Sequence, residues 1–175
     1  DDWWMNEKLK VCFNFINDKV DLVYHDLEIV SEQFRIFRKI IIKSWQVKAP
    51  VIIDLMVNGN ALATSSVVIR SRLLKQINGM SESYGMVGAE DYNTWLRIAQ
   101  LTNEFKYISK QLGFYYLHSQ GISSRKDMSV PTLSAVSEFT FLLKPQHRRK
   151  LEASLTYTKG RFQYLVGNYK AAEDN

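Results

Sequence analysis

Two adjacent carboxylates, Glu90 and Asp91, stand where the sequence predicts that a loop becomes a helix. Behind them, apolar side chains recur at helical spacing, at positions 92, 95, 96 and 99. The helix dipole favours ionised acids in a first turn, so the pattern can fix one anionic carboxylate at the edge of a cleft. That carboxylate could act as a general base towards a hydroxyl group. The alternative is a pair of ordinary helix N-terminal acids, which spacing alone favours.

Three further polar spots stand apart from the apolar pattern: Asp1 and Asp2; Thr64, Ser65 and Ser66; and His118. Adjacent aspartates without a neighbouring thiol or imidazole suit a hard cation, Mg²⁺ or Mn²⁺, bound jointly with phosphates. A histidine that follows a strand could add a metal ligand or a hydrogen bond to phosphate. Taken singly, each spot has an ordinary alternative: terminal acids, strand polarity, or a satisfied core histidine. Together they suit the removal of a group from a nucleoside diphosphate.

The elements that must position these residues follow from the spacing of apolar and turn-forming side chains. We expect helices over 5–17, 51–58, 71–79 and 90–99, and strands over 20–30, 61–70, 105–109 and 113–118. Ser71 is expected to cap its helix, and the polar stretch 119–129 is expected to be mobile. Two amphipathic helices follow Pro131, the second beginning at Pro145. Strands that alternate with helices predict an α/β sheet, whose ligands gather at the carboxyl ends of strands.

Composition bounds the class of protein. The chain has 175 residues, 46% hydrophobic content and a net charge of +5, which predicts a folded domain that suits anionic partners. The single cysteine, Cys12, makes neither an internal disulfide nor a zinc site, so a reducing compartment is expected. No run of 18 apolar residues is present. The first residues lack a basic n-region and an initiator Met, and predict a chain entered partway through a domain.

Residues 33–48 interleave aromatic and aliphatic side chains with Arg and Lys, and both helix and strand periods fit in part. One interpretation is an amphipathic element whose cations are solvated. The other is a basic aromatic patch that rests on anionic lipid.

Several blocks, in order, resemble family 2 glycosyltransferases of the GT-A fold. Residues 1–9 resemble the end of the metal-binding D-x-D-D segment with its W-x-x-x-K-L continuation, and residues 20–26 resemble the next strand. Residues 60–70 and 74–82 are similar to the N-x-x-x-T-S-S strand and G-x-x-E turn. Residues 90–97 resemble E-D-Y-x-x-W-L-R, and residues 112–118 resemble L-x-x-Y-R-x-H, with Tyr116 in place of arginine.

The resemblance implies a partial GT-A, Rossmann-like mixed sheet with flanking helices. Residues 1–126 would be the acceptor-side half and residues 127–175 a helical extension, the nucleotide-binding half lying outside this sequence. Asp91 would be the catalytic base, with Glu90 beside it. The expected metal ligands are Asp1, Asp2 and His118, and the expected substrate-binding residues are Thr64, Ser65, Ser66, Trp95, Arg97 and His118.

The implied activity is inverting, metal-dependent transfer of a sugar from a nucleotide-diphosphate sugar to an acceptor hydroxyl, with Mg²⁺ or Mn²⁺ as cofactor. The acceptor would be a glycan, a lipid-linked molecule or another hydroxyl compound of polysaccharide or glycoconjugate synthesis. The expected location is cytoplasmic, or peripheral at the inner face of the membrane. The alternative from another class is a non-catalytic binding or membrane-associated scaffold module. No nucleic-acid partner is expected, because the basic residues are not clustered.

Overall fold

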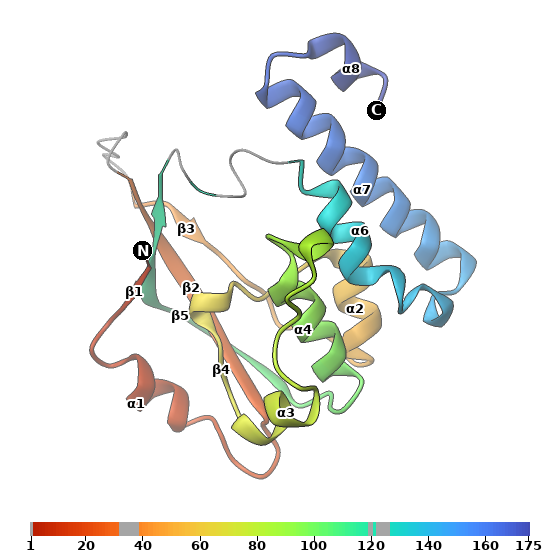
Figure 1. Ribbon diagram of the computed structural model, residues 1–175. Helices are drawn as coiled ribbons and strands as arrows, with labels where there is room; N and C mark the ends of the chain where they lie inside the picture. Colours follow the sequence, from red (N-terminus) through yellow and green to blue (C-terminus); the bar gives the residue numbers. More distant parts are fainter. Residues whose placement is uncertain (1, 32–38, 119–120, 122–126) are drawn as a thin grey trace.

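Two long parallel strands, β2 (Leu22–Ser31) and β5 (Phe105–Leu117), form the centre of the sheet (Figure 1). The short strands β1 (Trp3–Trp4), β3 (Ile41–Ile42) and β4 (Val68–Ile69) pair antiparallel with them: β1 with β5, and β3 and β4 with β2. The computed structural model describes residues 2–31, 39–118, 121 and 127–175. This mixed sheet confirms the predicted α/β class, while the GT-A arrangement stays a prediction.

Helices cover both faces of the sheet because successive side chains of β2 point in opposite directions. Val23 packs with Cys12 of α1 (Lys8–Phe13) on one face. Leu22 and Tyr24 face the larger core on the other side, where α2 (Val51–Asn58) and α4 (Glu90–Ala99) pack. The alternation of β2 therefore creates a three-layered structure.

The connection between β2 and β5 carries most of the candidate site. Parallel strands need a crossover, and here it contains α2, the single turn η1 (Thr64–Ser66), α3 (Ser71–Gln76), the turn η2 (Tyr84–Met86) and α4. The predicted apolar face of α4 is confirmed, since the side chains at positions 92, 95, 96 and 99 are all buried. The helix after Pro50 is confirmed as well.

The C-terminal part is helical, as predicted, and comprises α6 (Ser129–Ser137), the turn η3 (Thr140–Leu142), α7 (Pro145–Leu165) and α8 (Tyr169–Glu173). Ala135, Val136 and Leu151 join the same core as α2 and α4. Beyond Leu151, α7 extends away from the sheet, and α8 folds against its far end (Figure 1). The division at residue 126 stays a prediction, although these helices share one core with the sheet.

Three local predictions outside residues 61–70 are wrong. The helix expected over 5–17 is limited to Lys8–Phe13. The strands expected over 105–109 and 113–118 are one strand, β5, whose pairing with β2 shifts register around Asp26. The polar residues Lys110 and Gln111 lie in this irregularity, so they mark a β-bulge and not the end of a strand. Ser71 does not cap α3, because the N-cap position is Arg70.

Two other predictions fall partly outside the described residues. Of segment 33–48, residues 39–48 form β3 and extended chain, so no helix forms there, and residues 33–38 are not described. The stretch 119–129, expected to be mobile, includes residues 119–120 and 122–126, which are not described either. The helix expected after Pro131 already begins at Ser129, and it ends at Ser137.

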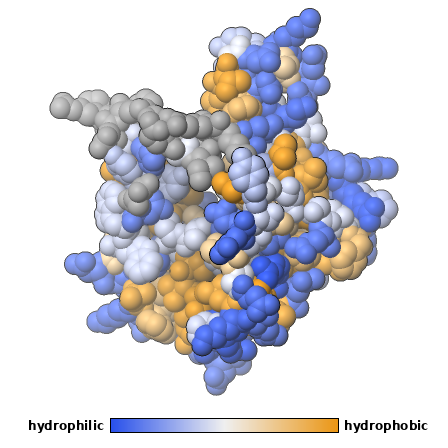
Figure 2. Space-filling view, viewed as in Figure 1, coloured by the Kyte–Doolittle hydropathy of each residue, from blue (hydrophilic) through white to orange (hydrophobic). Residues whose placement is uncertain are grey.

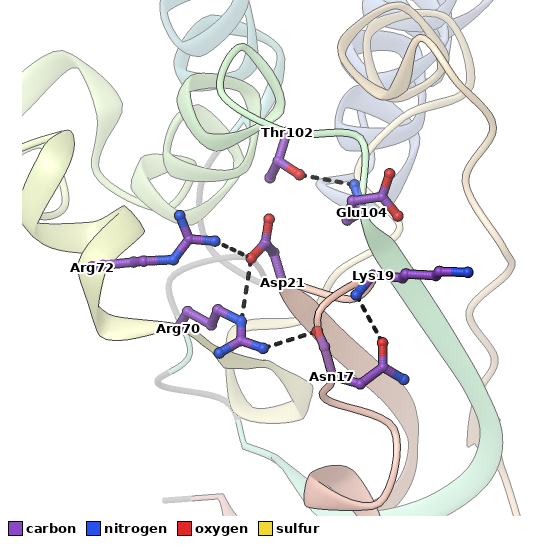
Figure 3. A network of polar contacts seen from close by, with 7 residues as sticks. All are labelled: Asn17, Lys19, Asp21, Arg70, Arg72, Thr102 and Glu104. Atoms are coloured by element: carbon purple, nitrogen blue, oxygen red, sulfur yellow. Dashed lines mark hydrogen bonds and ion pairs between the residues drawn. The ribbon is translucent and has the colours of Figure 1, made fainter.

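A network of charged side chains holds the amino end of β2 to the chain that follows β4 (Figure 3). The Asp21 carboxylate accepts from Arg72 and lies 3.3 Å from Arg70 Nε. Arg70 also donates to the main-chain oxygen of Asn17 at 2.8 Å. The network thereby fixes β4 and α3 at the end of β2 opposite to the candidate site.

Candidate active site

Asp91 and Thr64 form the centre of the candidate site. Asp91 lies in the first turn of α4, where Tyr92 N donates to its Oδ1 at 2.6 Å. Thr64 Oγ1, from η1, donates to Asp91 Oδ2 at 2.7 Å. Asn60 also hydrogen-bonds to the Asp91 side chain. The structure therefore brings together two of the predicted site residues, and adds Asn60, whose only sequence signal is its place in the N-x-x-x-T block.

Burial raises the pKa of the Asp91 carboxyl group, and the neighbouring Glu90 charge adds to the increase. The hydrogen bonds from Thr64, Tyr92 and Asn60 oppose it, because they stabilise the ionised form. A carboxylate with a raised pKa is a stronger base than an exposed one. Asp91 is thus suited to accept a proton from a hydroxyl group that reaches it.

Glu90 has a different position. Its Oε2 accepts from Gly88 N at 2.6 Å, and Gly88 has φ +93°, a conformation that favours glycine. Thr94 Oγ1 donates to the main-chain oxygen of Glu90 at 2.7 Å. Glu90 therefore closes the turn that leads into α4, and it influences Asp91 through its charge.

The strand predicted over 61–70 is wrong around the Thr-Ser-Ser triplet, which is a one-turn 3₁₀ helix. Ser66 N donates to Ala63 O at 2.9 Å, and Ser66 Oγ donates to the same oxygen at 2.7 Å. Side-chain bonding of serine to a nearby carbonyl competes with strand pairing, and only Val68 and Ile69 pair with β2. The turn exposes Thr64 towards Asp91 and buries Ser66.

Two residues that sequence analysis did not assign to the site hold this turn from the other side. Lys8 Nζ donates to Ser65 O at 2.7 Å, and Trp4 Nε1 donates to the same oxygen at 3.0 Å. Lys8 Nζ also lies 3.8 Å from the centre of the Trp4 ring. Lys8 is completely buried, and desolvation lowers its pKa to about 8. The W-x-x-x-K spacing was the available signal, but it does not indicate a buried amine.

The predicted substrate-binding residues Trp95 and Arg97 have intramolecular partners. Trp95 is 4% exposed, and its Nε1 donates to Leu62 O at 3.1 Å. Arg97 donates to Gly79 O at 3.0 Å and to Ile77 O. These contacts attach the chain before η1 and the end of α3 to α4. They give both residues a structural role, and the predicted role in substrate binding is untested.

Two of the predicted metal ligands, Asp2 and His118, lie near the carboxyl-terminal part of β5. Asp2 Oδ1 accepts from Tyr116 N at 2.9 Å, and the His118 ring stacks on the Tyr116 ring at 5.5 Å between centroids. Asp1 lies outside the described residues. In the described part of the chain, no group of three or more His, Cys, Asp or Glu side chains could hold a metal ion. Asp2 and His118 alone do not make a metal site, so we derive no chemical step through a cation.

Neither a scan of the sequence against protein-family models nor a comparison with curated proteins finds a match.

Proposed function

We propose that the protein transfers a sugar from a nucleotide-diphosphate sugar to an acceptor hydroxyl, with inversion at the anomeric carbon. The observation that carries the proposal is the pairing of Asp91 with Thr64 next to a helix N-terminus, with burial raising the pKa of the carboxyl group. The sequence resemblance to family 2 glycosyltransferases supplies the reaction class. A bacterial-type pathway of polysaccharide or glycoconjugate synthesis is the context that fits this class.

In the proposed step, ionised Asp91 accepts the proton of the acceptor hydroxyl while that oxygen attacks the anomeric carbon. A new carbon–oxygen bond forms, and the bond from the anomeric carbon to the diphosphate breaks. The electron pair of the broken bond leaves with the diphosphate. The hydrogen bond from Thr64 fixes one carboxylate oxygen, and Tyr92 N fixes the other, so that the base is oriented before the acceptor binds.

A divalent cation, Mg²⁺ or Mn²⁺, would stabilise the charge of the leaving diphosphate. The residues proposed to take part are Asp2, His118 and Asp1. Of these three residues, the structure describes Asp2 and His118. The nucleotide-sugar donor is therefore proposed to bind near the chain around Tyr116.

The test is Asp91→Asn in the intact enzyme, including the nucleotide-binding half expected outside residues 1–175, assayed with a panel of nucleotide sugars and simple glycoside acceptors. We expect the variant to lose most of its turnover, by a factor of 100 or more, as is typical when a general base is removed, about 10²–10⁴-fold. Donor affinity, measured by calorimetry, should stay close to wild type. Turnover that survives the substitution would refute the role of Asp91 as base.

A second candidate function is a peripheral membrane module, and the surface of α7 and α8 favours it. Tyr157, Tyr164 and Tyr169 are exposed there, beside a groove of about 820 Å³. Figure 2 shows apolar residues among hydrophilic ones on this end of the molecule. Aromatic side chains beside basic ones suit the interface of an anionic bilayer. Among the described residues, no helix is long and apolar enough to cross a membrane.

Co-sedimentation with vesicles of phosphatidylserine and phosphatidylcholine tests the second candidate. Binding that falls steeply with salt, and that is lost in Tyr157→Ser with Tyr164→Ser, would support it. Equal recovery in the supernatant with and without vesicles would exclude it.

A further inference from the structure

The main-chain oxygen of Ser65 joins two parts of the molecule that are far apart in sequence. Lys8 and Trp4 donate to it from the N-terminal segment, at 2.7 Å and 3.0 Å. The preceding residue, Thr64, donates to Asp91 Oδ2 at 2.7 Å. A carbonyl oxygen has two lone pairs, so both are used, and the orientation of this peptide group is fixed.

Lys8 cannot contact a substrate, because its side chain is completely buried. Burial of an ammonium group is costly unless the group is hydrogen-bonded or paired. The Lys8 ammonium group donates to one acceptor, Ser65 O, and lies over the Trp4 ring. The titratable groups that interact with its charge include Cys12 and His25. An apolar side chain of similar length would avoid the cost of burying the amine. Compared with such a side chain, the Lys8 amine is not expected to add stability, and what it adds is the hydrogen bond to Ser65 O.

We propose that Lys8 is a positioning residue, which through Ser65 holds the η1 turn so that Thr64 stays hydrogen-bonded to Asp91. The inference rests on the proposed function only for its relevance to turnover, because the geometry can be tested without a substrate. It also connects the segment that carries Asp2 to the proposed base. The donor side and the acceptor side of the site are then linked by one main-chain carbonyl.

The Asp91 carboxyl group reports on this link. The hydrogen bond from Thr64 lowers its pKa, whereas burial and the Glu90 charge raise it. The charge of Lys8 is not among the resolved causes of the Asp91 shift. A direct effect of the Lys8 charge would persist when Thr64 is replaced, whereas an effect transmitted through Thr64 would not, so substitution of Lys8 with and without Thr64 separates the two.

The experiment is a carbon-13 NMR titration of the Asp91 side-chain carboxyl, assigned with Asp91→Asn, in the full chain. We expect a higher Asp91 pKa in Thr64→Val and a smaller increase in Lys8→Met. The double variant should match Thr64→Val, because the hydrogen bond can be lost only once. Lys10→Met, the same substitution at an exposed position of the same helix, should leave the titration unchanged.

An Asp91 pKa in Lys8→Met equal to that of wild type would overturn the proposal, and so would additive shifts in the double variant.

Urea unfolding provides a second readout. A positioning role predicts that Lys8→Met is as stable as wild type or more stable, while turnover falls about 10-fold. If Lys8→Met does not fold, Trp4→Phe is the second variant, because it removes the other donor to Ser65 O and keeps an aromatic side chain. Trp4→Phe should also raise the Asp91 pKa. Turnover without Asp91 would refute the proposed function, but it would leave this result unaffected.

Discussion

Thr64 Oγ1 and Asp91 Oδ2 are joined by a hydrogen bond of 2.7 Å between a one-turn 3₁₀ helix and the first turn of α4. Together with the hydrogen bond from Tyr92 N to Oδ1, this bond fixes the orientation of the carboxylate, and it stabilises the ionised form. The hydrogen bond from Thr64 lowers the pKa of Asp91, whereas burial raises it. The protonation of the proposed base is therefore set by a balance that single substitutions can change in either direction.

Thr64→Val tests one side of this balance. The substitution keeps the shape of the side chain and removes the donor, so the pKa of Asp91 should rise further. Because the base must be ionised, the acidic limb of the pH dependence of kcat/KM should move to higher pH. Thr64→Ser keeps a hydroxyl donor and should restore the wild-type limb. If the limb in Thr64→Val coincides with that of wild type, the hydrogen bond does not act on the base.

Asp91→Asn tests the other side. Burial raises the pKa of this carboxyl group, so between the unfolded and folded pKa values the folded state binds more protons than the unfolded state. The free energy of unfolding consequently falls as pH rises through this window. At a pH above both values the full cost is present, and Asp91→Asn should there be more stable than wild type by about 1 kcal/mol.

The stability advantage of Asp91→Asn should disappear at a pH below both values. Chemical denaturation at several pH values measures it, and Asp18→Asn, at an exposed position, provides the control. A variant that is less stable than wild type at a pH above both values would contradict the proposed burial cost.

His25 predicts a loss of stability in acid. The residue is 2% exposed, and burial lowers its pKa to about 4. Between that value and about 6.5, the usual pKa of histidine, the unfolded chain binds a proton that the folded chain does not. Stability should therefore fall as pH decreases from about 6.5 to 4, by up to about 3 kcal/mol.

In His25→Phe, this part of the pH dependence should be absent, even if the variant is less stable at every pH. His147→Phe, on α7, should retain the slope of wild type. Parallel slopes for His25→Phe and wild type would show that His25 is protonated equally in both states.

Asp21 is expected to stabilise the amino end of β2. Its ion pairs with Arg70 and Arg72 lie at the surface, where such pairs contribute modestly. Asp21→Asn should lower the free energy of unfolding by about 1 kcal/mol at low salt, and by less in 1 M NaCl. Arg70→Met should cost more than Arg72→Met, since Arg70 also donates to Asn17. An equal loss at both salt concentrations would mean that the contacts act by packing.

Local patterns were sufficient for the central elements. The strand β2 was predicted from β-branched and aromatic residues, and α4 from its apolar spacing. The bulge in β5 was not predicted, because a register shift depends on the partner strand and not on the bulged sequence. The triplet at Thr64 was misassigned since threonine and serine fit both a strand and a turn.

The candidate site was predicted in its residue types and only partly in its geometry. The resemblance named both Asp91 and Thr64, but only the folded chain shows that they are hydrogen-bonded. The motif includes Lys8 but does not predict its burial. Burial of this lysine depends on contacts with Ser65 and Trp4 that no local pattern encodes. The role of Trp95 in substrate binding stays a prediction, and the hydrogen bond from its indole Nε1 to Leu62 O could not be predicted from spacing.

The pairing of β2 with β5 has a consequence for the order of folding. Leu22 pairs with Phe105, so the whole crossover that carries Thr64 and Asp91 is a loop closed by these strands. Closing a loop of this length costs chain entropy before any contact is gained, and such topologies fold slowly. During synthesis, β2 therefore has no main partner strand until β5 has left the ribosome. Thr64 and Asp91 both lie within this crossover, so their hydrogen bond closes a shorter loop than the pairing of β2 with β5 and does not depend on it for chain entropy.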